Sequence, residues 1–599
     1  METILGIDLG TTNSEVAIIR NNKVEVLYED GEAILPSVVG LDADGRLLVG
    51  APARNQWVLA PERTVRSIKR RMGEADAVRL GDQQYTPQEI SAFILRKLKQ
   101  RAEQQLGQPV GKAVITVPAF FNETQREATR EAGELAGLEV VRIINEPTAA
   151  SLTYDPHPEK MERLLIYDLG GGTFDVSIVQ IEQGVVEVLS SHGDTHLGGD
   201  DFDQLLSDFV CEDFRREQGV ELRESLAAKS RVLRAVEEAK KRLSLEPIVQ
   251  IEEEFIAEKQ GAPLHLRREI RRTEYEELIE PLLAKTLKCL DESLSDAKLN
   301  ANQIDKVILV GGASRTPMVH RLLEEQLGQP VHAEVDPDLC VAMGAAIQGG
   351  LIAGVDVGPV LVDITPHTLG IQALGEMGAR VSHYRFARLI ERNSPLPTGR
   401  SEIFTTAVDG QQRARIAVFQ GEDDDVRHND PVGEFVLDGL AEVERGNEIL
   451  VRFDLDLDGI LKVSATERST GRQKQLTIDN AVTRFRADNR QEALARVDAM
   501  FQPGQPGIGA GLAASHQTTA QSATPLAAEL PAEMAQLVDR CQRLIVKSQE
   551  LKQQSNPADV EEMQRLVEQL SAAMMQRSQT EMEGIAAQLE DLVFYLQDA

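Results

Sequence analysis

Residues 6–14 read GIDLGTTNS and residues 167–175 read YDLGGGTFD, so an Asp-Leu-Gly motif followed by a threonine-bearing turn occurs twice in the chain. Each motif belongs to a short apolar run that is typical of a buried strand. The two aspartates, Asp8 and Asp168, are 160 residues apart. A repeat at this spacing predicts two related lobes that face a common cleft.

The residue types in these motifs suit the binding of a phosphate and a metal ion. An aspartate at a strand end can hold a hydrated Mg²⁺, because that ion prefers carboxylate and water oxygens. Glycines let backbone amides approach phosphate oxygens closely. The sequence contains no GxxxxGK[ST] P-loop. Residues 175–181 alternate like a strand, whereas a dinucleotide-binding fingerprint opens a helix. One motif alone is compatible with a tight turn, but the pair favours a nucleotide cleft.

The pattern around the motifs predicts an α/β fold over residues 1–350. Short apolar runs alternate there with longer helical patterns, and glycine turns follow several of the runs. We expect strands at residues 4–9, 16–19, 114–117, 164–168, 176–181 and 307–310, and helices at 87–106 and 124–136.

A different domain is predicted after a glycine-rich break at residues 349–360. The apolar Val360-Leu361-Val362 that follows has two readings, because it could dock on the first domain or begin the next one. Residues 367–481 alternate polar and apolar side chains between Asp-Gly and Thr-Gly turns, which predicts an antiparallel β domain.

The C-terminal part is predicted to be helical and interrupted by a tether. A helix is expected at residues 489–501. Residues 499–528 contain no Asp, Glu, Lys or Arg and are rich in small and polar residues. A tether of this length spans about 30 Å on average. From residue 531 onward, helical apolar stripes and a capping box at Thr580 and Glu583 predict a small helical bundle.

Composition excludes several classes of function. The 599 residues suggest three or four domains, and 64 basic against 96 acidic residues give a net charge of −32. This field repels nucleic acid and anionic lipid, so neither is an expected partner. The four cysteines are scattered, which disfavours a disulfide framework or a zinc site. With no leader or membrane-spanning apolar run in the sequence, we expect a soluble cytoplasmic protein.

Three further patterns are interpreted as ordinary structure. The run Asp454-x-Asp456-x-Asp458-Gly459 imitates a calcium loop, but its twelfth position is Ala465, so a β-hairpin turn is expected. The i, i+4 pair His192 and His196 lies among glycines that disfavour a zinc helix. The cations between residues 63 and 71 are interpreted mostly as a solvated helical face, with Lys69 as the one that meets a phosphate.

Together, six stretches resemble the DnaK-type chaperones of the heat shock protein 70 family. They are GIDLGTTNS (6–14), ITVPAFF (115–121), IINEPTAA (143–150), YDLGGGTFDVSI (167–178), GDTHLGGDDFD (193–203) and VILVGGASRTPMV (307–319). The resemblance is dense over residues 1–366 and continues through the β domain. It implies a two-lobed actin-like (ribonuclease H-like) α/β ATPase domain, then a β-sandwich peptide-binding domain and an α-helical C-terminal segment. The implied division is 1–352 ATPase, 353–366 linker, 367–481 β domain, 482–501 start of a helical lid, 502–530 tether and 531–599 helical bundle.

The resemblance also implies the roles of individual residues. Asp8 and Asp168 match the carboxylates that organise Mg²⁺ through water. The residues matching the catalytic set are Lys69, Glu146, Asp168, Thr173 and Asp175. Those matching the ATP/ADP-binding set are Gly10, Thr11, Thr12, Asn13, Gly170, Gly171, Gly172, Gly198, Gly199, Glu237, Lys240, Ser244, Gly311, Gly312, Ser314 and Arg315.

The implied function is an ATP-dependent chaperone that binds exposed apolar segments of unfolded proteins. Pro118, Arg126, Arg142 and Asp363 match residues that couple the domains, and a J-domain co-chaperone and a nucleotide exchange factor are the implied partners. The residues matching the peptide channel are Ile371, Leu374, Phe404, Ala407, Ala414 and Ile416. Two alternatives are a small-molecule kinase of the same superfamily and a non-hydrolysing relative that acts as an exchange factor or holdase.

The chain departs from the family pattern in four places. The stretch between Lys69 and Thr86 is shorter, and there is extra sequence between Ile371 and Asn393. Ala414 stands where a valine is common. The tether interrupts the lid region. These departures indicate a divergent, HscC-like bacterial paralogue.

Overall fold

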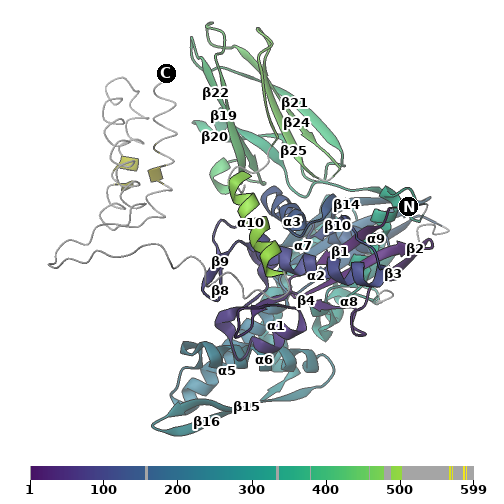
Figure 1. Ribbon diagram of the computed structural model, residues 1–599. Coiled ribbons are helices and arrows are strands. Elements are labelled where there is room, and N and C mark those ends of the chain that lie inside the picture. Colours follow the sequence, from purple (N-terminus) through teal and green to yellow (C-terminus); the bar gives the residue numbers. More distant parts are fainter. Residues whose placement is uncertain are drawn as a thin grey trace, which may run out of the picture.

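A computed structural model describes most of the chain (Figure 1). The described residues are 2–154, 160–331, 336–355, 357–377, 380–457, 459–477 and 487–501, with short helical pieces at 565–567, 569–570, 585–586 and 589. The predicted tether and nearly all of the predicted C-terminal bundle, including its capping box, lie outside the described residues.

Two mixed sheets form the frame of the N-terminal region, and each carries one motif. In the first, β1 (Ile4–Leu9) pairs antiparallel with β2 (Asn13–Arg20) and parallel with β10 (Lys112–Val117). In the second, β12 (Glu162–Leu169) pairs antiparallel with β13 (Phe174–Glu182) and parallel with β17 (Lys306–Val310). Each motif therefore occupies the turn between the first two strands of its sheet, as the predicted duplication requires. The first sheet contains β11 (Glu139–Asn145), β10 (Lys112–Val117), β1 (Ile4–Leu9), β2 (Asn13–Arg20), β3 (Lys23–Val26) and β4 (Leu35–Pro36). The second contains β17 (Lys306–Val310), β12 (Glu162–Leu169), β13 (Phe174–Glu182), β14 (Val185–Asp194) and β18 (Val360–Val362).

Helices cover both sheets and define two lobes. In lobe I, the region of the first sheet, α2 (Pro87–Leu106) and α3 (Glu123–Leu135) pack on each other, and capping boxes at Thr86 and Asn122 start them. Between the two sheets lies α4 (Glu146–Ser151), which contacts strands of both, and α9 (Cys340–Ile352) packs on α4 and on strands of the first sheet. In lobe II, the region of the second sheet, α7 (Arg272–Asp296) packs on β13 and β14. The other helices are α1 (Ala51–Gln56), α5 (Gly199–Gln218), α6 (Leu226–Leu243) and α8 (Pro317–Leu327).

Smaller sheets complete the lobes. They are β6 (Leu47–Val49), β5 (Val38–Leu41) and β7 (Thr64–Arg66); β8 (Val78–Leu80) with β9 (Gln83–Tyr85); and β15 (Ile248–Lys259) with β16 (Ala262–Arg271). Short 3₁₀ helices lie at η1 (Pro61–Arg63), η2 (Ile68–Arg71), η3 (Leu222–Glu224), η4 (Ala301–Gln303), η5 (Gly312–Arg315) and η6 (Val426–His428).

The predicted antiparallel β domain is present as two four-stranded sheets around one core that includes Phe435, Val451 and Phe453. It projects from the N-terminal region at the end opposite β15 and β16 (Figure 1). The calcium-like run begins at the end of β24 (Glu448–Leu455) and precedes β25 (Leu461–Glu467), as expected for a hairpin. One sheet contains β20 (Arg380–Ile390), β19 (Leu369–Met377), β22 (Arg413–Gln420) and β23 (Asp430–Asp438). The other contains β21 (Thr398–Thr405), β24 (Glu448–Leu455), β25 (Leu461–Glu467) and β26 (Gln473–Thr477).

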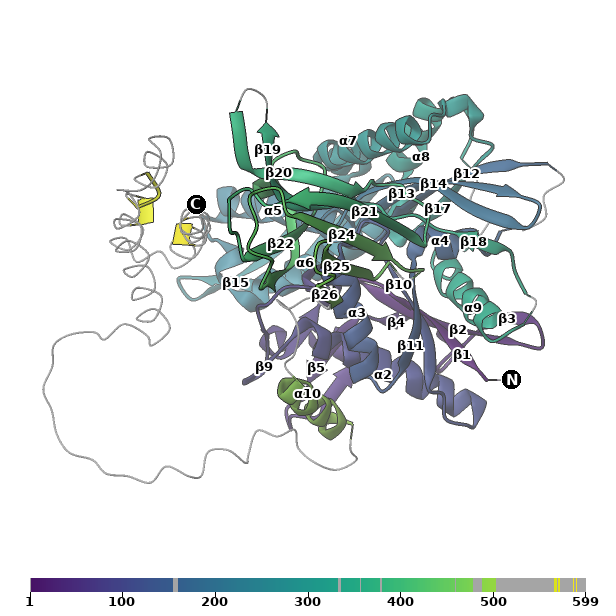
Figure 2. The same cartoon turned by 90° about the horizontal axis from the view of Figure 1, so that it is seen from above.

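Two segments join this β domain to the lobes. The Val360-Leu361-Val362 run forms β18 and pairs parallel with β14 of lobe II. Of the two possibilities, docking on the first domain or beginning the next one, the structure shows docking. The helix expected at 489–501 is α10 (Ala487–Met500), which lies against α2 and α3 (Figure 2). Ala493 and Val497 of α10 are fully buried in the core of lobe I.

Candidate functional site

A cavity of about 330 Å³ lies between the lobes where the two motif turns meet. The structure thus brings together the two halves of the site that the sequence indicated 160 residues apart. The predicted site residues that line it are Asp8, Gly10, Thr11, Thr12, Asn13, Lys69, Glu146, Asp168, Gly170, Gly171, Thr173, Gly199, Glu237, Lys240, Gly311, Gly312 and Arg315.

Five predicted site residues lie behind this lining. Gly172 and Gly198 pack backbone against backbone, since a Cβ on Gly198 would lie 2.5 Å from the amide nitrogen of Gly172. Ser244 follows the last residue of α6, and Ser314 is buried in η5. Asp175 is buried at the start of β13. These residues support the walls of the cavity.

A lysine and several carboxylates share the buried floor of the cavity. Lys69 is 3% exposed and forms an ion pair with Glu146. Burial raises the pKa of Asp8 and of Asp168, and it raises the pKa of Glu146 to about 7. Burial alone would lower the pKa of Lys69, but Glu146, Asp8 and Asp168 outweigh it and raise that pKa. The floor therefore holds a fixed cation and an excess of carboxylates, an oxygen donor set that suits Mg²⁺.

The turns beside the floor offer unpaired hydrogen-bonding groups to an anion. The hydroxyl of Thr12 is buried, lines the cavity and has no partner among the described residues. A Cβ on Gly171 would lie 1.9 Å from that hydroxyl, so a glycine is required there. The 20-residue helix α5 begins at Gly199 in the cavity wall. Its N-terminal amides and helix dipole favour negative charge, so this part of the cavity fits phosphate groups.

The far wall of the cavity combines α6 with η5. Lys240 of α6 donates to the Asp203 carboxylate at 2.8 Å and to the Gly199 carbonyl at 2.9 Å. Gly311 has a φ of +79°, and a Cβ there would lie 2.4 Å from the Leu169 carbonyl oxygen. The sequence missed Asp203, and it also missed Glu15, a buried carboxylate of the lining. Asp203 ends the stretch 193–203 and Glu15 directly follows the stretch 6–14, but the residue pattern alone gave neither of them a role in the site.

Arg66 and Arg70 connect the lobes across the mouth of the cavity, and the prediction that they belong to a solvated face was wrong. The guanidinium of Arg66 lies 4.3 Å from the centroid of the Trp57 ring and 3.6 Å from the Glu237 carboxylate. Arg70 donates to Asp201 at 3.0 Å. Arg66 ends the strand β7 and Arg70 lies in the short 3₁₀ turn η2, so the two side chains do not belong to the single helical face that the pattern indicated.

A chain of hydrogen bonds runs from the cavity wall to the segment after β18. Asp175 accepts from the amides of Ala119 and Phe120 at 3.0 and 3.1 Å. Arg126 holds the other side of the same segment by donating to the Ala119 carbonyl at 3.0 Å and to the Asn145 side chain at 2.6 Å. Asn145 in turn donates to the Asp363 carboxylate at 3.1 Å. Three of the four predicted coupling residues, Pro118, Arg126 and Asp363, therefore belong to one connected set of contacts. Pro118 begins the segment that contains Ala119 and Phe120.

The fourth predicted coupling residue, Arg142, lies apart from this chain. It is on β11, where it pairs with Val114 of β10. The structure places it in lobe I, on the same strand that ends at Asn145.

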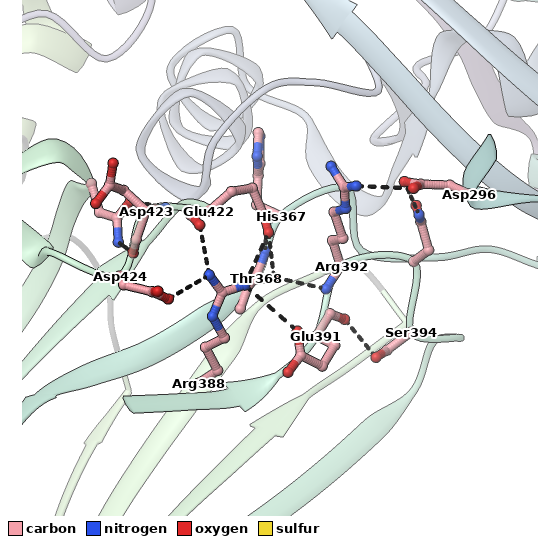
Figure 3. A network of polar contacts seen from close by, with 12 residues as sticks. Asp296, His367, Thr368, Arg388, Glu391, Arg392, Ser394, Glu422, Asp423 and Asp424 are labelled. Carbon is pink, nitrogen blue, oxygen red and sulfur yellow. Dashed lines mark hydrogen bonds and ion pairs between the residues drawn. The ribbon is translucent and has the colours of Figure 1, made fainter. Parts of the chain in front are cut away.

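A second contact between the β domain and lobe II centres on Asp296, the last residue of α7. Its carboxylate accepts from Arg392 at 2.9 Å and from Asn393 at 2.9 Å, and it faces His192 at 2.9 Å. The backbone amide of Arg392 donates to the Thr368 hydroxyl at 3.1 Å, so the contact continues into the β domain (Figure 3). The sequence carried no signal for this cluster, because its members are distant in the chain.

The acidic loop before η6 extends this contact. Thr368 donates to Glu422 at 3.0 Å, and Arg388 of β20 donates to Asp424 at 3.0 Å (Figure 3). Strand β20 is thereby tied to the domain contact at Asp296.

The six predicted peptide-channel residues divide into buried and exposed ones. Ile371, Ala414 and Ile416 are buried on one face of the β20–β19–β22–β23 sheet, and Phe404 packs partly against the same core. Leu374 is 43% exposed and Ala407 is exposed in the loop after β21.

Comparison with known proteins identifies the relatives of this chain. A family model described as Hsp70 protein matches residues 4–79 and 74–598. The chaperone protein DnaK of Thermotoga petrophila is 47% identical over 486 residues, which cover 80% of this chain and 80% of that protein. The DnaK chaperones of Thermotoga maritima and Thermotoga neapolitana match with the same identity and coverage. Within the described part of the chain, the helices include none with the length and hydropathy needed to cross a bilayer.

Proposed function

The chain belongs to the Hsp70 family, and from that premise we propose how its own residues carry out the work. It is an ATPase and an ATP-dependent chaperone that binds unfolded proteins. We propose residues 1–352 as the ATPase domain, 353–366 as the linker, 367–481 as the peptide-binding domain and 482–599 as the helical lid region with its tether.

The cavity between the lobes is the proposed ATP site. Asp8 and Asp168 would hold Mg²⁺ through water, and the ion would neutralise charge on the phosphates. Lys69, fixed by Glu146, would place its ammonium group against the γ-phosphate and the attacking water. Thr173 and the amides of the glycine turns would hold the phosphate oxygens in line. Positioning and charge neutralisation carry most of the catalysis in phosphoryl transfer, and these groups supply both.

The non-hydrolysing alternative is not favoured. Such a relative could lose any of Lys69, Glu146, Asp168 and Thr173, yet all four line one cavity. The kinase alternative is not favoured either, because a small-molecule kinase would not need a β domain docked on the ATPase lobes.

The observation that carries the proposal is the hydrogen-bonded chain from Asp175 to Asp363, together with the pairing of β18 with β14. A shift of the segment 118–121 on nucleotide exchange would change the partners of Arg126 and Asn145, and hence the hold on Asp363. We propose that this transmits the nucleotide state to the peptide channel. A J-domain co-chaperone and a nucleotide exchange factor are proposed as partners, and the cytoplasm as the compartment.

A peptide-release experiment tests this function. A fluorescent heptapeptide with an aliphatic centre, bound to the ADP form, is chased with unlabelled peptide in ATP or in ADP. We expect release to be at least about tenfold faster with ATP, because nucleotide coupling in proteins is typically about 1–3 kcal/mol. Equal release rates in the two nucleotides would refute the coupling. The Lys69→Ala variant serves as a control, since ATP binding alone should still accelerate release there.

A titratable histidine makes the docking of the β domain pH-dependent. The Nε2 of His367 lies 3.1 Å from the Phe120 carbonyl oxygen, so the neutral ring donates to it. Burial lowers the pKa of His367 to about 4, and Arg126, His192 and Arg392 face it as well. Nearby carboxylates are already engaged, Asp296 by Arg392 and His192.

Docking should therefore weaken as the pH falls below about 6.5, the ordinary pKa of an undocked histidine. The docked form excludes the proton, so the undocked form gains stability on acidification. At pH 5.5 we expect the docking constant to fall by up to about tenfold. Energy transfer between dyes on the ATPase and β domains would measure it. In His367→Leu the docking constant should depend less on pH. An equally steep decline of the docking constant in that variant would assign the effect to other groups.

A further inference from the structure

Strand β20 carries an arginine on the face that forms the proposed peptide channel. Across β19 and β20, Ile371 pairs with Ala387 and Ala373 pairs with Arg385. Paired residues of an antiparallel ladder share a face, and the face repeats every second residue. Ile371 and Ala387 are both buried on the inner face. Arg385 therefore lies on that same face, one pair further toward the end of the hairpin.

A glycine makes room for this arginine beside the channel. A Cβ on Gly375 would lie 2.6 Å from the Cδ of Arg385 and 2.9 Å from its Nη1. The side chain of Arg385 thus crosses Gly375, the immediate neighbour of Leu374. Leu374 is one of the proposed channel residues and is 43% exposed. The cation therefore lies on the face of the sheet that carries Ile371, one residue pair beyond the buried Ile371–Ala387 pair.

Arg385 has no counter-ion within the described part of the chain, although the protein has a net charge of −32. The neighbouring arginines are paired: Arg388 donates to Asp424 at 3.0 Å and Arg427 to Asp425 at 2.6 Å. Asp425 forms a backbone bridge with Arg385, but its carboxylate is taken by Arg427. The exposed side chain of Arg385 is left facing solvent.

The facing sheet does not cancel this charge. Its edge strand β21 exposes Arg400 and Glu402, which are two residues apart and so share one face of the strand. Their opposite charges offset each other. The excess charge on this face, beside Gly375, is therefore that of Arg385.

We propose that Arg385 makes the channel select extended client segments in which a carboxylate lies next to the bound aliphatic side chain. A guanidinium recognises a carboxylate through two parallel hydrogen bonds, which fixes the position of the acidic group. The carboxylate could be an Asp or Glu side chain or the C-terminus of a client. This inference rests on the proposed peptide channel, and it adds the chemical class of the preferred client.

Binding of labelled peptides to the full chain in ADP tests the proposal. All peptides share one aliphatic central residue and carry Asp, Asn or Lys on one side of it or the other. Their C-termini are amidated, except in one additional Asn peptide whose C-terminal carboxylate is left free. We expect one of the two Asp positions to bind about fivefold more tightly than its Asn counterpart, and Lys there to bind more weakly. The gain should shrink as salt rises from 50 to 500 mM, which screens an exposed pair. A gain for the free C-terminus instead would name the terminal carboxylate as the recognised group.

Two variants separate this inference from the channel itself. Arg385→Gln should reduce the preference for Asp to less than about twofold, and Arg385→Glu should reverse it in favour of Lys. Arg400→Gln, the matched control on β21, should keep the wild-type order. Equal binding of Asp and Asn peptides by the wild type, or a preference that survives in Arg385→Gln, would overturn the role of Arg385. If the neutral peptide fails to bind at all, the channel assignment fails, and the inference with it.

Discussion

Replacing Lys69 with alanine is expected to lower the rate of single-turnover ATP cleavage by about a hundredfold or more while ATP binding changes little. The ammonium group is 3% exposed and is held by Glu146 on the cavity floor, so water cannot take its place with the same orientation. The phosphate-holding groups on the turns and on α5 remain in the variant, and they account for the retained binding. Mixing ATP with excess enzyme and following the cleaved phosphate measures the chemical step alone.

Two companion variants sharpen this test. Thr173→Ala removes a hydroxyl from the lining of the cavity and should lower cleavage without abolishing ATP binding. Arg71→Ala is the matched control: Arg71 belongs to the same 3₁₀ turn as Lys69, but its partner is the exposed Glu74 at 2.7 Å. Unchanged single-turnover cleavage in Lys69→Ala would refute its catalytic role. An equal loss in Arg71→Ala would show that the variants act through the turn and not through the ammonium group.

The sequence predicted the parts of the site that depend on short motifs. Asp8 and Asp168 lie at the ends of apolar strands and are followed at once by glycine turns, so their chemistry can be inferred from adjacent residues. The antiparallel β domain was also predictable, because period-two alternation reports a half-buried sheet. The family comparison supports the same function from the whole chain.

Contacts between distant segments were not predictable. Arg66 lies in a run of cations whose local pattern fits a solvated face, and only the position of α6 gives it Glu237 as a partner. Asp296, Arg392 and Thr368 come from three separate elements. The run at β18 was ambiguous for a physical reason, since three apolar residues can pair with any available strand edge. The edge of β14 takes that place here.

A single substitution at Asp363 should uncouple the nucleotide cavity from the peptide-binding β domain. Its carboxylate accepts from the Asn145 amide at 3.1 and 3.2 Å and from the amide of Ile364 at 2.8 Å. Burial raises the pKa of Asp363, while these hydrogen bonds and the charge of Arg126 oppose that rise. Asp363→Asn would set a second amide donor against Asn145 and remove the negative charge that faces Arg126. The change keeps the volume of the side chain, so it tests hydrogen bonding and charge and not packing.

In Asp363→Asn we expect peptide to lose most of its stimulation of ATP hydrolysis, and ATP to lose most of its acceleration of peptide release. Both losses should appear together, because the same Asn145–Asp363 contact would carry the signal in each direction. For a coupling of about 1–3 kcal/mol, each effect should shrink by roughly 5- to 150-fold at the limit of complete uncoupling. Asp438→Asn is the matched control, since that carboxylate pairs with Arg413 at 2.8 Å on the exposed edge of the β domain. Normal stimulation in Asp363→Asn would exclude the Asn145–Asp363 contact as the route. A loss of stimulation with fully retained ATP-driven release would contradict Asp363 as the shared route, and the ATPase effect would then have to arise within the nucleotide cavity itself.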